Sequence, residues 1–292
     1  MTYHLLHFFL KLLSYIPFGM LYLLSDGLFY PLYYLVGYRR KIVRKNLTES
    51  FPEKSLSEIK QIEKRFYHSF IDIILESCKL ASISPDEIKR RMQFVNVEAV
   101  NSFLRQEKSV SIYLGHYGNW EWISSMPLWL EKSAISAQIY HKLSNKHMDR
   151  LILNIRERMG ATCVNMRKTA RYVTEMAAEH KTCVIGFIAD QSPRKKEVRH
   201  FLHFLHHNTP VLTGTEKIIK HYGFESFFLR VKRTKRGHYV AEFVQLHDNP
   251  SSLPDFELTA LYYQHLEQMI IEQPELYLWT HKRFRLAEKL DH

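Results

Sequence analysis

Two residue types that together can move a proton, a histidine and a glutamate, stand five positions apart at His116 and Glu121 in the segment "YLGHYGNWEW". An imidazole with an ordinary pKa of about 6.5 is a suitable general base near neutral pH. A carboxylate hydrogen-bonded to its other nitrogen fixes the tautomer and stabilises the imidazolium that forms. No serine or cysteine stands nearby in a recognisable nucleophile motif. The pair therefore predicts a base that activates a hydroxyl group of the substrate itself.

The residues around the pair favour a turn that approaches a ligand. Gly115 and Gly118 let the backbone bend tightly. Asn119 is a good N-cap, and a carboxylate in the first helical turn complements the helix dipole. With His116 in the turn and Glu121 on that first helical turn, the two side chains converge. The same residues also suit an ordinary turn with a hydrogen-bonded histidine and a helix-start glutamate, so spacing alone leaves both interpretations open.

The segment before His116 predicts a buried strand, because serine and tyrosine alternate with valine, isoleucine and leucine there. Strands are expected over residues 109–115, 134–140, 161–166 and 182–191, and helices over residues 119–132, 144–160 and 169–180. This alternation predicts an α/β fold with a mixed, partly parallel central sheet flanked by helices. Ligands of such sheets bind at the carboxyl ends of the strands. His116 stands at such an end, and so do Asp190 and Gln191.

Further elements are expected on both sides of this core. A long helix begins near Ser55 or Ser57, either of which can cap it, and apolar residues recur along it at helical spacing. A hairpin over residues 225–246 and a final helix over residues 255–272 precede the segment "LYLWTHKRFR". No linker or change of composition marks a domain boundary after residue 50.

The first forty residues are almost wholly apolar and aromatic, with breaks at Pro17 and Pro31, and the basic run "RRKIVRK" follows them. They lack the leading positive charge and the small-residue cleavage site of a signal peptide. A spanning helix needs roughly 20 apolar residues, which residues 5–24 supply, while the proline breaks suit a re-entrant or interfacial hairpin equally well. In either case the basic run belongs at the cytoplasmic headgroups. The alternative is a buried helical hairpin of a soluble protein.

The difference between the apolar first forty residues and the rest of the chain predicts a division into two parts. Residues 1–45 are expected to form a membrane-associated helical hairpin with its basic run, which serves as an apolar N-terminal anchor. Residues 46–292 are expected to form the α/β domain. Three cysteines lie far apart and form no C-x-x-C pair, which argues against a disulfide framework and a cysteine zinc site. A reducing compartment follows, so the α/β domain is expected to face the cytoplasm.

The overall charge limits the partners. Lysine and arginine number 41 against 30 aspartates and glutamates, a net charge of +11, in a chain that is 46% hydrophobic and 24% charged. Such a composition is that of a folded protein. The excess of positive charge favours anionic partners, whether phosphates, acidic lipids, acidic proteins or nucleic acid. Charge alone does not choose among them.

One family shares these motifs. The segment "GHYGNWEW" resembles the G-H-x-G-N-W-E signature of the lipid A biosynthesis acyltransferases, the lauroyl and myristoyl transferases of Gram-negative bacteria. They belong to the wider glycerolipid acyltransferase group with its H-x-x-x-x-D/E motif. The resemblance covers nearly the whole chain, through "NLTESFP", "IRERMG", "IADQSP" and "WTHKRFR". It implies a glycerolipid-acyltransferase-like fold and the transfer of a fatty acyl group from acyl carrier protein to a hydroxyl of a lipid A precursor, without a cofactor.

The resemblance also implies roles for single residues. His116 is the base and Glu121 its partner in a catalytic dyad. The other residues expected at the substrate are Asn119, Arg156, Arg158, Asp190, Gln191 and Arg194. The two arginines of "IRERMG" match a family pattern that meets phosphate or the phosphopantetheine of the carrier, a task that suits the planar guanidinium. Two helical positions two apart point to different sides, so one of these arginines, Arg156, is the better candidate.

Two expectations concern charge and cavity. The oxyanion of the transferred acyl group is expected to be held by backbone N–H groups near Gly118 or by a basic side chain. An apolar groove beside the site is expected to hold the acyl chain. Basic clusters at Arg194–Lys196 and at residues 230–236 suit an anionic lipid and an acidic carrier protein, or are simply solvated.

A group of histidines superficially suggests a metal site. His200, His203, His206 and His207 lie in "RHFLHFLHH", but no carboxylate stands at ligand spacing and the H-E-x-x-H motif is absent. No metal is therefore expected, and contact with headgroups or a plain surface location is the preferred interpretation. The stretch departs from the family, in which phenylalanine with glycine or asparagine is usual.

The sequence thus predicts a bacterial inner-membrane acyltransferase with its catalytic domain on the cytoplasmic face. Its expected partners are acyl carrier protein, a lipid A precursor and the membrane, and no nucleic acid. One alternative is an acyltransferase of the same group that acts on a lysophospholipid or an amino-acid lipid. A more distant alternative is a non-enzymatic basic protein that binds membranes or nucleic acid.

Overall fold

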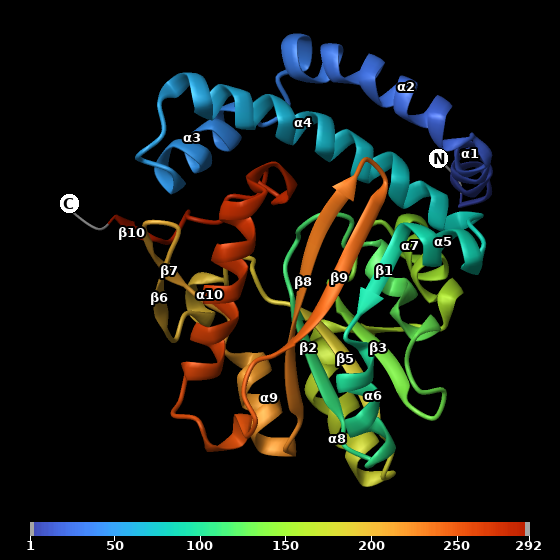
Figure 1. The fold of residues 1–292 in the computed structure, drawn as a ribbon, viewed down its shortest axis with the longest axis vertical. Coiled ribbons are helices and arrows are strands. Elements are labelled where there is room, and N and C mark those ends of the chain that lie inside the picture. The colour runs from blue at the N-terminus through green and yellow to red at the C-terminus, as the bar shows by residue number, and fades with distance from the viewer. Residues whose placement is uncertain (1–2, 290–292) are drawn as a thin grey trace.

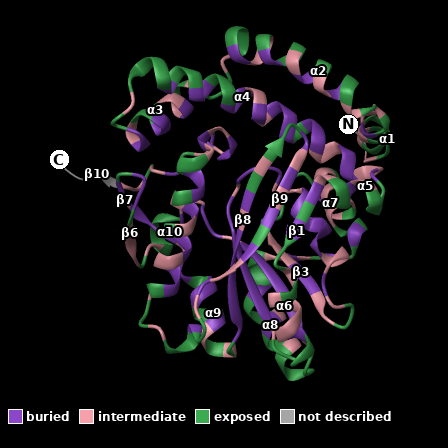
Figure 2. Ribbon diagram, viewed as in Figure 1, coloured by how far each residue is buried: buried purple, intermediate pink, exposed green. Residues whose placement is uncertain are grey.

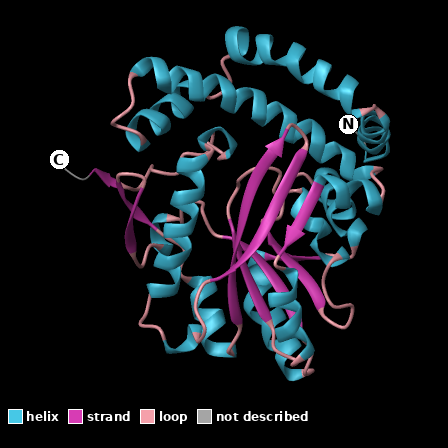
Figure 3. Cartoon of the chain, in the orientation of Figure 1, coloured by secondary structure: helices cyan, strands magenta, loops and turns pink. Residues whose placement is uncertain are grey.

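A seven-stranded sheet forms the centre of the molecule in the computed structural model, which describes residues 3–289 (Figure 1, Figure 3). Its strand order is β1-β9-β8-β2-β5-β3-β4. The strands are β1 (Met92–Val95), β2 (Val110–Leu114), β3 (Ile135–Tyr140), β4 (Thr162–Asn165), β5 (Cys183–Ile188), β8 (Glu225–Lys235) and β9 (His238–Gln245). All neighbours pair in parallel except β8 and β9, which form the expected hairpin. The predicted mixed α/β fold is confirmed.

The two strands that lead to the candidate site lie side by side in the middle of the sheet. Every residue of β2 is buried, and β5 is buried except at its last residue. Strands covered on both faces are rich in valine and isoleucine, as these two are. Leu114 pairs with Ile188 in the parallel register, so Gly115 and Ala189 leave the sheet at the same edge.

Helices cover the sheet as expected. α10 (Glu257–Glu272) contacts β8, α6 (Val97–Arg105) contacts β2 and β9, and α7 (Lys146–Arg156) and α8 (Thr169–Ala178) contact β4. α5 (Pro85–Arg91) begins after Ser84, whose hydroxyl accepts a hydrogen bond from the Glu87 N–H. α9 (Gly214–Tyr222) packs beside α8.

Four N-terminal helices lie across one end of this core. α1 (Tyr3–Tyr15) and α2 (Phe18–Tyr30), the latter extended by a π-helical turn (Pro31–Val36), meet at a bend of 111°. α2 runs alongside α4 (Leu56–Cys78). α3 (Arg40–Ser50) lies beside the N-terminal end of α4 (Figure 1). A capping box starts α4, since Ser55 and Glu58 bond each other's backbone N–H groups. The prediction of Ser55 as the cap is confirmed.

The expected apolar hairpin is present, but its role as a membrane anchor is not confirmed. Within residues 3–289 no single helix has the length and hydropathy of a membrane span, although α1 and α2 with its extension pass that test as a bent pair. Their outer surface is apolar and exposed (Figure 2): Leu23 is 73% exposed and Leu35 is 83% exposed. Their inner surface, with Leu21 and Phe29, joins the same core as the sheet, and the division at residue 45 stays a prediction.

Three parts of the fold differ from the sequence expectation. The helix predicted over residues 119–132 is a short 3₁₀ segment, Trp122–Leu128, because Pro127 lacks an N–H group and breaks the helical pattern. β1 was not predicted, since its four residues lie directly between two helices. The middle loop contains two strands, β6 (Phe201–Phe204) and β7 (His207–Pro210), and β10 (Glu288–Lys289) near the end of the chain pairs with β7 to complete a second, three-stranded sheet.

Candidate active site

His116 lies in a tight turn that the C-terminal segment holds in place. The Tyr117 N–H donates to the Gly115 carbonyl at 2.8 Å, and Gly118 has a φ of +56°, which glycine adopts without strain. The His116 carbonyl accepts a hydrogen bond from the Leu278 N–H at 3.1 Å. The Gly118 N–H donates to the Leu276 carbonyl at 3.0 Å. The turn is therefore fixed on both sides by backbone from residues 276–278.

The direct partner of His116 is Asp190. The His116 Nδ1 atom lies 2.7 Å from Asp190 Oδ1, and the His116 backbone N–H donates to Oδ2 at 3.1 Å. Both oxygens of the Asp190 carboxylate thus form hydrogen bonds with His116. The side chain of Asp190 is 3% exposed, whereas that of His116 is 19% exposed. A substrate can therefore contact the imidazole ring of His116, whereas the carboxylate of Asp190 is closed off from solvent.

The ionisation of Asp190 determines the tautomer of the ring. Burial alone raises the pKa of Asp190, but the charge of His116, its ring and backbone hydrogen bonds and the charge of Arg283 hold that pKa below the usual value. An ionised carboxylate only accepts hydrogen bonds, so Nδ1 carries the proton. Nε2 is then free to accept one, and Gln191 Nε2 lies 3.3 Å from it.

Glu121 bonds an arginine and not the histidine, which corrects the expected dyad geometry. Arg156 on α7 donates to Glu121 through Nε at 2.7 Å and through Nη2 at 2.5 Å. Burial opposes the charge on Arg156, yet the hydrogen bond and the charge of Glu121 outweigh it and raise the pKa of the guanidinium. A bidentate arginine is a stronger partner for a carboxylate than an imidazole. The predicted hydrogen bond between His116 and Glu121 is not confirmed.

A cavity of about 370 Å³ brings these groups together. Its volume lies at the lower end of the range of small-molecule pockets, about 300–1,000 Å³. The polar residues that line it include His116, Glu121, Arg156, Gln191 and Arg194. The rest is mainly apolar, with Ile123, Met126, Pro127, Ile139, Leu153 and Ile188 among the lining residues.

The apolar part runs along the face of the sheet. Side chains alternate along a strand, so Gly186, Ile188 and Asp190 share one face of β5 and its continuation. Gly186 and Ile188 both line the cavity, and Asp190 at the end of the row holds His116. The cavity therefore extends along β5 from the imidazole by about 13 Å, four residues at about 3.3 Å each.

Three of the expected substrate residues do not line the cavity: Asp190, which holds His116 as described above, Arg158 and Asn119. Arg158 donates through Nη1 to the carbonyls of Leu80 at 2.8 Å and Ile83 at 2.7 Å, outside the cavity wall. Asn119 is fully buried and accepts a hydrogen bond from the Trp122 N–H at 3.1 Å, which is the predicted capping role. Neither residue lines the cavity. Their positions assign them to holding the backbone.

Two adjacent tyrosines of α10 form hydrogen bonds with the ends of the strands that carry the site. The Tyr262 hydroxyl donates to the Leu114 carbonyl at 3.1 Å, and the Tyr263 hydroxyl donates to the Ala189 carbonyl at 3.0 Å. The buried Arg283 donates to the Tyr263 hydroxyl at 2.9 Å. Sequence reasoning did not single out these tyrosines, and their adjacency in an otherwise amphipathic helix is the only local signal.

Two backbone donors of the turn are already engaged within the protein and do not fit the expected oxyanion hole. The Gly118 N–H already donates to Leu276, and the His116 N–H already donates to Asp190. An oxyanion needs donors that are not engaged by the protein itself. The second expectation, a basic side chain, agrees better with the cavity wall, to which Arg156 and Arg194 both contribute.

The histidine-rich segment lies on the second sheet. His200 stacks on Phe256 with ring centroids 4.2 Å apart, and His207 stacks on Phe284 with centroids 3.9 Å apart. In the described part of the chain no group of three or more histidine, cysteine, aspartate and glutamate side chains is placed to hold a metal ion. The imidazoles of His200 and His207 pack against aromatic rings.

Comparison with known proteins gives one family. The family model described as bacterial lipid A biosynthesis acyltransferase matches residues 1–286. A search of curated proteins found no match. The matched range covers the N-terminal helices, the whole seven-stranded sheet and the C-terminal segment that holds the His116 turn.

Proposed function

The chain belongs to the bacterial lipid A biosynthesis acyltransferase family, and we propose that it moves a fatty acyl chain from acyl carrier protein to a hydroxyl of a lipid A precursor. It is an acyltransferase, as membership of the family implies. The observation that carries the proposal is the His116–Asp190 pair at one end of an apolar cavity. This arrangement supplies a base where an acyl chain and an incoming hydroxyl can meet.

The proposed step is a base-assisted attack on a thioester. Nε2 of His116 takes the proton of the acceptor hydroxyl, and the oxygen attacks the thioester carbonyl. Asp190 stabilises the imidazolium through Nδ1, as the buried carboxylate does in hydrolytic triads. Collapse of the tetrahedral intermediate forms the ester bond and breaks the carbon–sulfur bond. The imidazolium then returns the proton to the leaving thiolate of the carrier.

We assign the stabilisation of the oxyanion to Arg156. Its guanidinium has five N–H donors, and Glu121 engages it through Nε and Nη2. The donors on Nη1 are therefore available for the developing charge. In this scheme Glu121 orients the arginine and holds it at the cavity, and it acts on the reaction through Arg156.

The proposal places the N-terminal hairpin at the inner face of the bacterial inner membrane. Most of the exposed large apolar side chains in the described part of the chain belong to α1, α2 and the turn that follows. Exposed apolar surfaces of this extent mark interaction sites with lipid or protein. The basic residues from Arg39 to Lys45 follow at once. Anionic headgroups attract such a run with about 1 kcal/mol per basic residue.

The test is transfer by purified protein from an acyl–acyl carrier protein thioester to a lipid A precursor. His116→Ala should lower kcat by about 10²–10⁴-fold, the usual contribution of a general base. His147→Ala is the matched control, because this histidine is exposed at the start of α7. Near-normal turnover of His116→Ala would contradict the catalytic assignment.

The acceptor is tested separately. Parallel reactions with a lysophospholipid and with an amino-acid lipid use the same donor, and mass spectrometry identifies the acylated product. Transfer only to the lipid A precursor is expected. Transfer only to another acceptor would leave the acyltransferase chemistry intact and remove the lipid A precursor as the substrate.

A further inference from the structure

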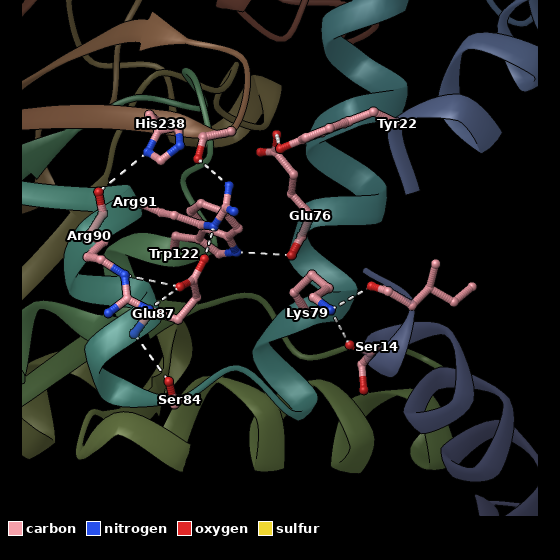
Figure 4. A network of polar contacts seen from close by, with 12 residues as sticks. Ser14, Tyr22, Glu76, Lys79, Ser84, Glu87, Arg90, Arg91, Trp122 and His238 are labelled. Carbon is pink, nitrogen blue, oxygen red and sulfur yellow. Dashed lines mark hydrogen bonds and ion pairs between the residues drawn. The ribbon is translucent and has the colours of Figure 1, made fainter. Parts of the chain in front are cut away.

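A carboxylate outside the cavity, Glu76 on α4, is fully buried (Figure 4). Its Oε2 atom accepts hydrogen bonds from Asn119 Nδ2 at 3.0 Å and from the Tyr239 hydroxyl at 2.8 Å. Its Oε1 atom accepts a hydrogen bond from the Tyr22 hydroxyl at 3.0 Å. The three donors come from the catalytic turn, from β9 and from the N-terminal hairpin. Glu76 therefore joins three elements that are distant in the sequence.

The contact with the catalytic turn is made twice. Asn119, which donates to the Glu76 carboxylate, stands between His116 and Glu121 and accepts from the Trp122 N–H through Oδ1. The Trp122 indole N–H donates to the backbone carbonyl of Glu76 at 3.0 Å (Figure 4). One residue of α4 thus holds the turn through both its side chain and its backbone.

The contact with the hairpin is also made twice. Beside the Tyr22 bond, Lys79, which directly follows α4, donates to the carbonyls of Ser14 at 2.5 Å and Ile16 at 2.8 Å, at the bend between α1 and α2 (Figure 4). The outer surface of α2 is apolar, since Leu23 is 73% exposed. The segment from Glu76 to Lys79, at the C-terminal end of α4, therefore connects the exposed hairpin to the turn that carries His116.

A buried carboxylate in such a place is costly unless all its partners are present. Burial raises the pKa of Glu76 to about 7, while the hydrogen bonds from Asn119, Tyr239 and Tyr22 favour the ionised form. All three donors are neutral side chains. Loss of the Tyr22 hydroxyl would leave Oε1 without the one donor that the hairpin supplies.

We propose that Glu76 is a positioning residue that couples the seating of the N-terminal hairpin on a lipid surface to the geometry of the His116 turn. The coupling rests on the proposed function. A seated hairpin holds Tyr22 against Glu76, and Glu76 in turn holds Asn119 and the turn between His116 and Glu121. Acyl transfer is then faster on a lipid surface than in detergent, because the hydrogen bonds of Glu76 link the hairpin to the turn.

The experiment compares two tyrosine variants that remove equivalent hydroxyls. Tyr22→Phe removes the donor to Glu76. Tyr33→Phe removes a donor to Glu63 at 2.9 Å, also between the hairpin and α4, but the other partner of Glu63 is Arg44 and not the catalytic turn. Transfer is measured on vesicles of phosphatidylethanolamine and phosphatidylglycerol and in detergent micelles, after thermal unfolding has shown that each variant is folded.

The expected result is a loss in kcat on vesicles of about tenfold for Tyr22→Phe, because a misplaced catalytic group costs up to about 10²-fold. KM should be unchanged, and Tyr33→Phe should behave as wild type. Glu76→Gln should show the same selective loss on vesicles. Equal kcat values for Tyr22→Phe and Tyr33→Phe on vesicles would overturn the coupling while the proposed function stands.

A second measurement tests the coupling without the reaction. Hydrogen exchange of the amides of residues 116–122 should slow when wild-type protein binds vesicles, and this protection should vanish in Tyr22→Phe but not in Tyr33→Phe. Unchanged exchange in vesicle-bound wild type would overturn the coupling. A wild type that transfers no acyl chain to any acceptor, yet shows the protection, would reject the proposed function and retain the link between hairpin and turn.

Discussion

The His116 ring and the Asp190 carboxylate meet at 2.7 Å although 74 positions separate them in the chain. Their meeting follows from the sheet. β2 and β5 are parallel neighbours with Leu114 opposite Ile188, so the residues that follow both strands leave at one edge. A base at the end of one strand and its carboxylate at the end of the next need no loop to bring them together.

This geometry predicts different effects for the two carboxylates at the site. Asp190→Asn removes the charge that fixes the ring tautomer and stabilises the imidazolium, so kcat should fall by about 10²–10⁴-fold. Glu121→Gln keeps one acceptor for Arg156 and should cost about tenfold. The pH profile of kcat should shift in Asp190→Asn alone. A shifted profile in Glu121→Gln with none in Asp190→Asn would restore the dyad that the H-x-x-x-x-E spacing predicted.

A steric prediction concerns the first residue of the turn. A Cβ atom on Gly115 would lie 2.7 Å from Leu266 Cδ1, closer than real side chains approach. Gly115→Ala should therefore lower the free energy of unfolding by about 1–3 kcal/mol. Leu266→Val removes the clashing atom, so the double variant should be more stable than the sum of the two single effects. Gly214→Ala is the control, since its added Cβ meets nothing within 4 Å.

Simple additivity of the Gly115 and Leu266 effects in chemical denaturation would show that the clash is relieved by backbone movement instead. The helical position of Leu266 adds a small β-branching cost for valine, which the Leu266→Val single variant measures.

The cavity floor predicts a change in chain-length preference. Gly186 lines the apolar part, and an added methyl there would lie 3.6 Å from Leu114 Cδ2, an ordinary contact. Gly186→Ala should therefore keep the fold and shorten the space for the acyl chain. Burial of one methylene contributes about 0.8 kcal/mol, so the preference should move toward shorter chains by about fourfold per carbon. Competition between acyl-carrier thioesters of different length measures it, with Gly214→Ala as control, and an unchanged preference would place the acyl chain elsewhere.

A pH prediction follows from the C-terminal segment. Nε2 of His281 accepts a hydrogen bond from the Ser192 N–H at 3.3 Å, which requires a neutral ring. Burial is the main cause that lowers the pKa of His281 from 6.5 to about 4. The charges of Arg283 and His116 lower it further, and the charge of Asp190 opposes them. Between these values the unfolded chain binds a proton that the folded chain does not. The free energy of unfolding should therefore fall as the pH drops from about 6.5 to about 4.

His281→Gln removes this titration. Its free energy of unfolding should fall less steeply than that of wild type over the same window, and the two should run in parallel above pH 6.5. Denaturant titrations at four pH values measure the difference. Parallel curves throughout would mean that His281 titrates alike in the folded and unfolded states.

The central fold could be predicted because its signals are local. Runs of valine and isoleucine in β2 and β5, and the helices between strands, carry their own periodicity. The second sheet could not, because β6 and β7 have four residues each and hold histidine, asparagine and proline. The spacing of apolar residues over 119–132 predicts a long helix, but Pro127 limits the structure to a short 3₁₀ segment at Trp122–Leu128.

The site could be predicted only in part. The sequence pattern predicts His116 and the position of Asp190 at the end of a strand. Their contact, however, depends on β2 and β5 being neighbours in the sheet, and the strand order is not evident from the sequence. The H-x-x-x-x-E spacing predicts Glu121 as the partner of His116, because the two residues are close in the chain. Arg156 arrives from α7 and takes that carboxylate instead. The link through Glu76 depends on three separate elements and has no local signature.

The order in which the ribosome releases this chain matters for its chemistry. The His116 turn is fastened by Leu276 and Leu278, and Tyr117 forms a bridge with Tyr277. At about 5–20 residues per second, the 162 residues between His116 and Leu278 take on the order of ten to thirty seconds to synthesise. The apolar hairpin emerges before the His116 turn, and the fastening segment emerges after both. The active turn is therefore incomplete until residues 276–278 have been synthesised, so catalysis begins only after that point.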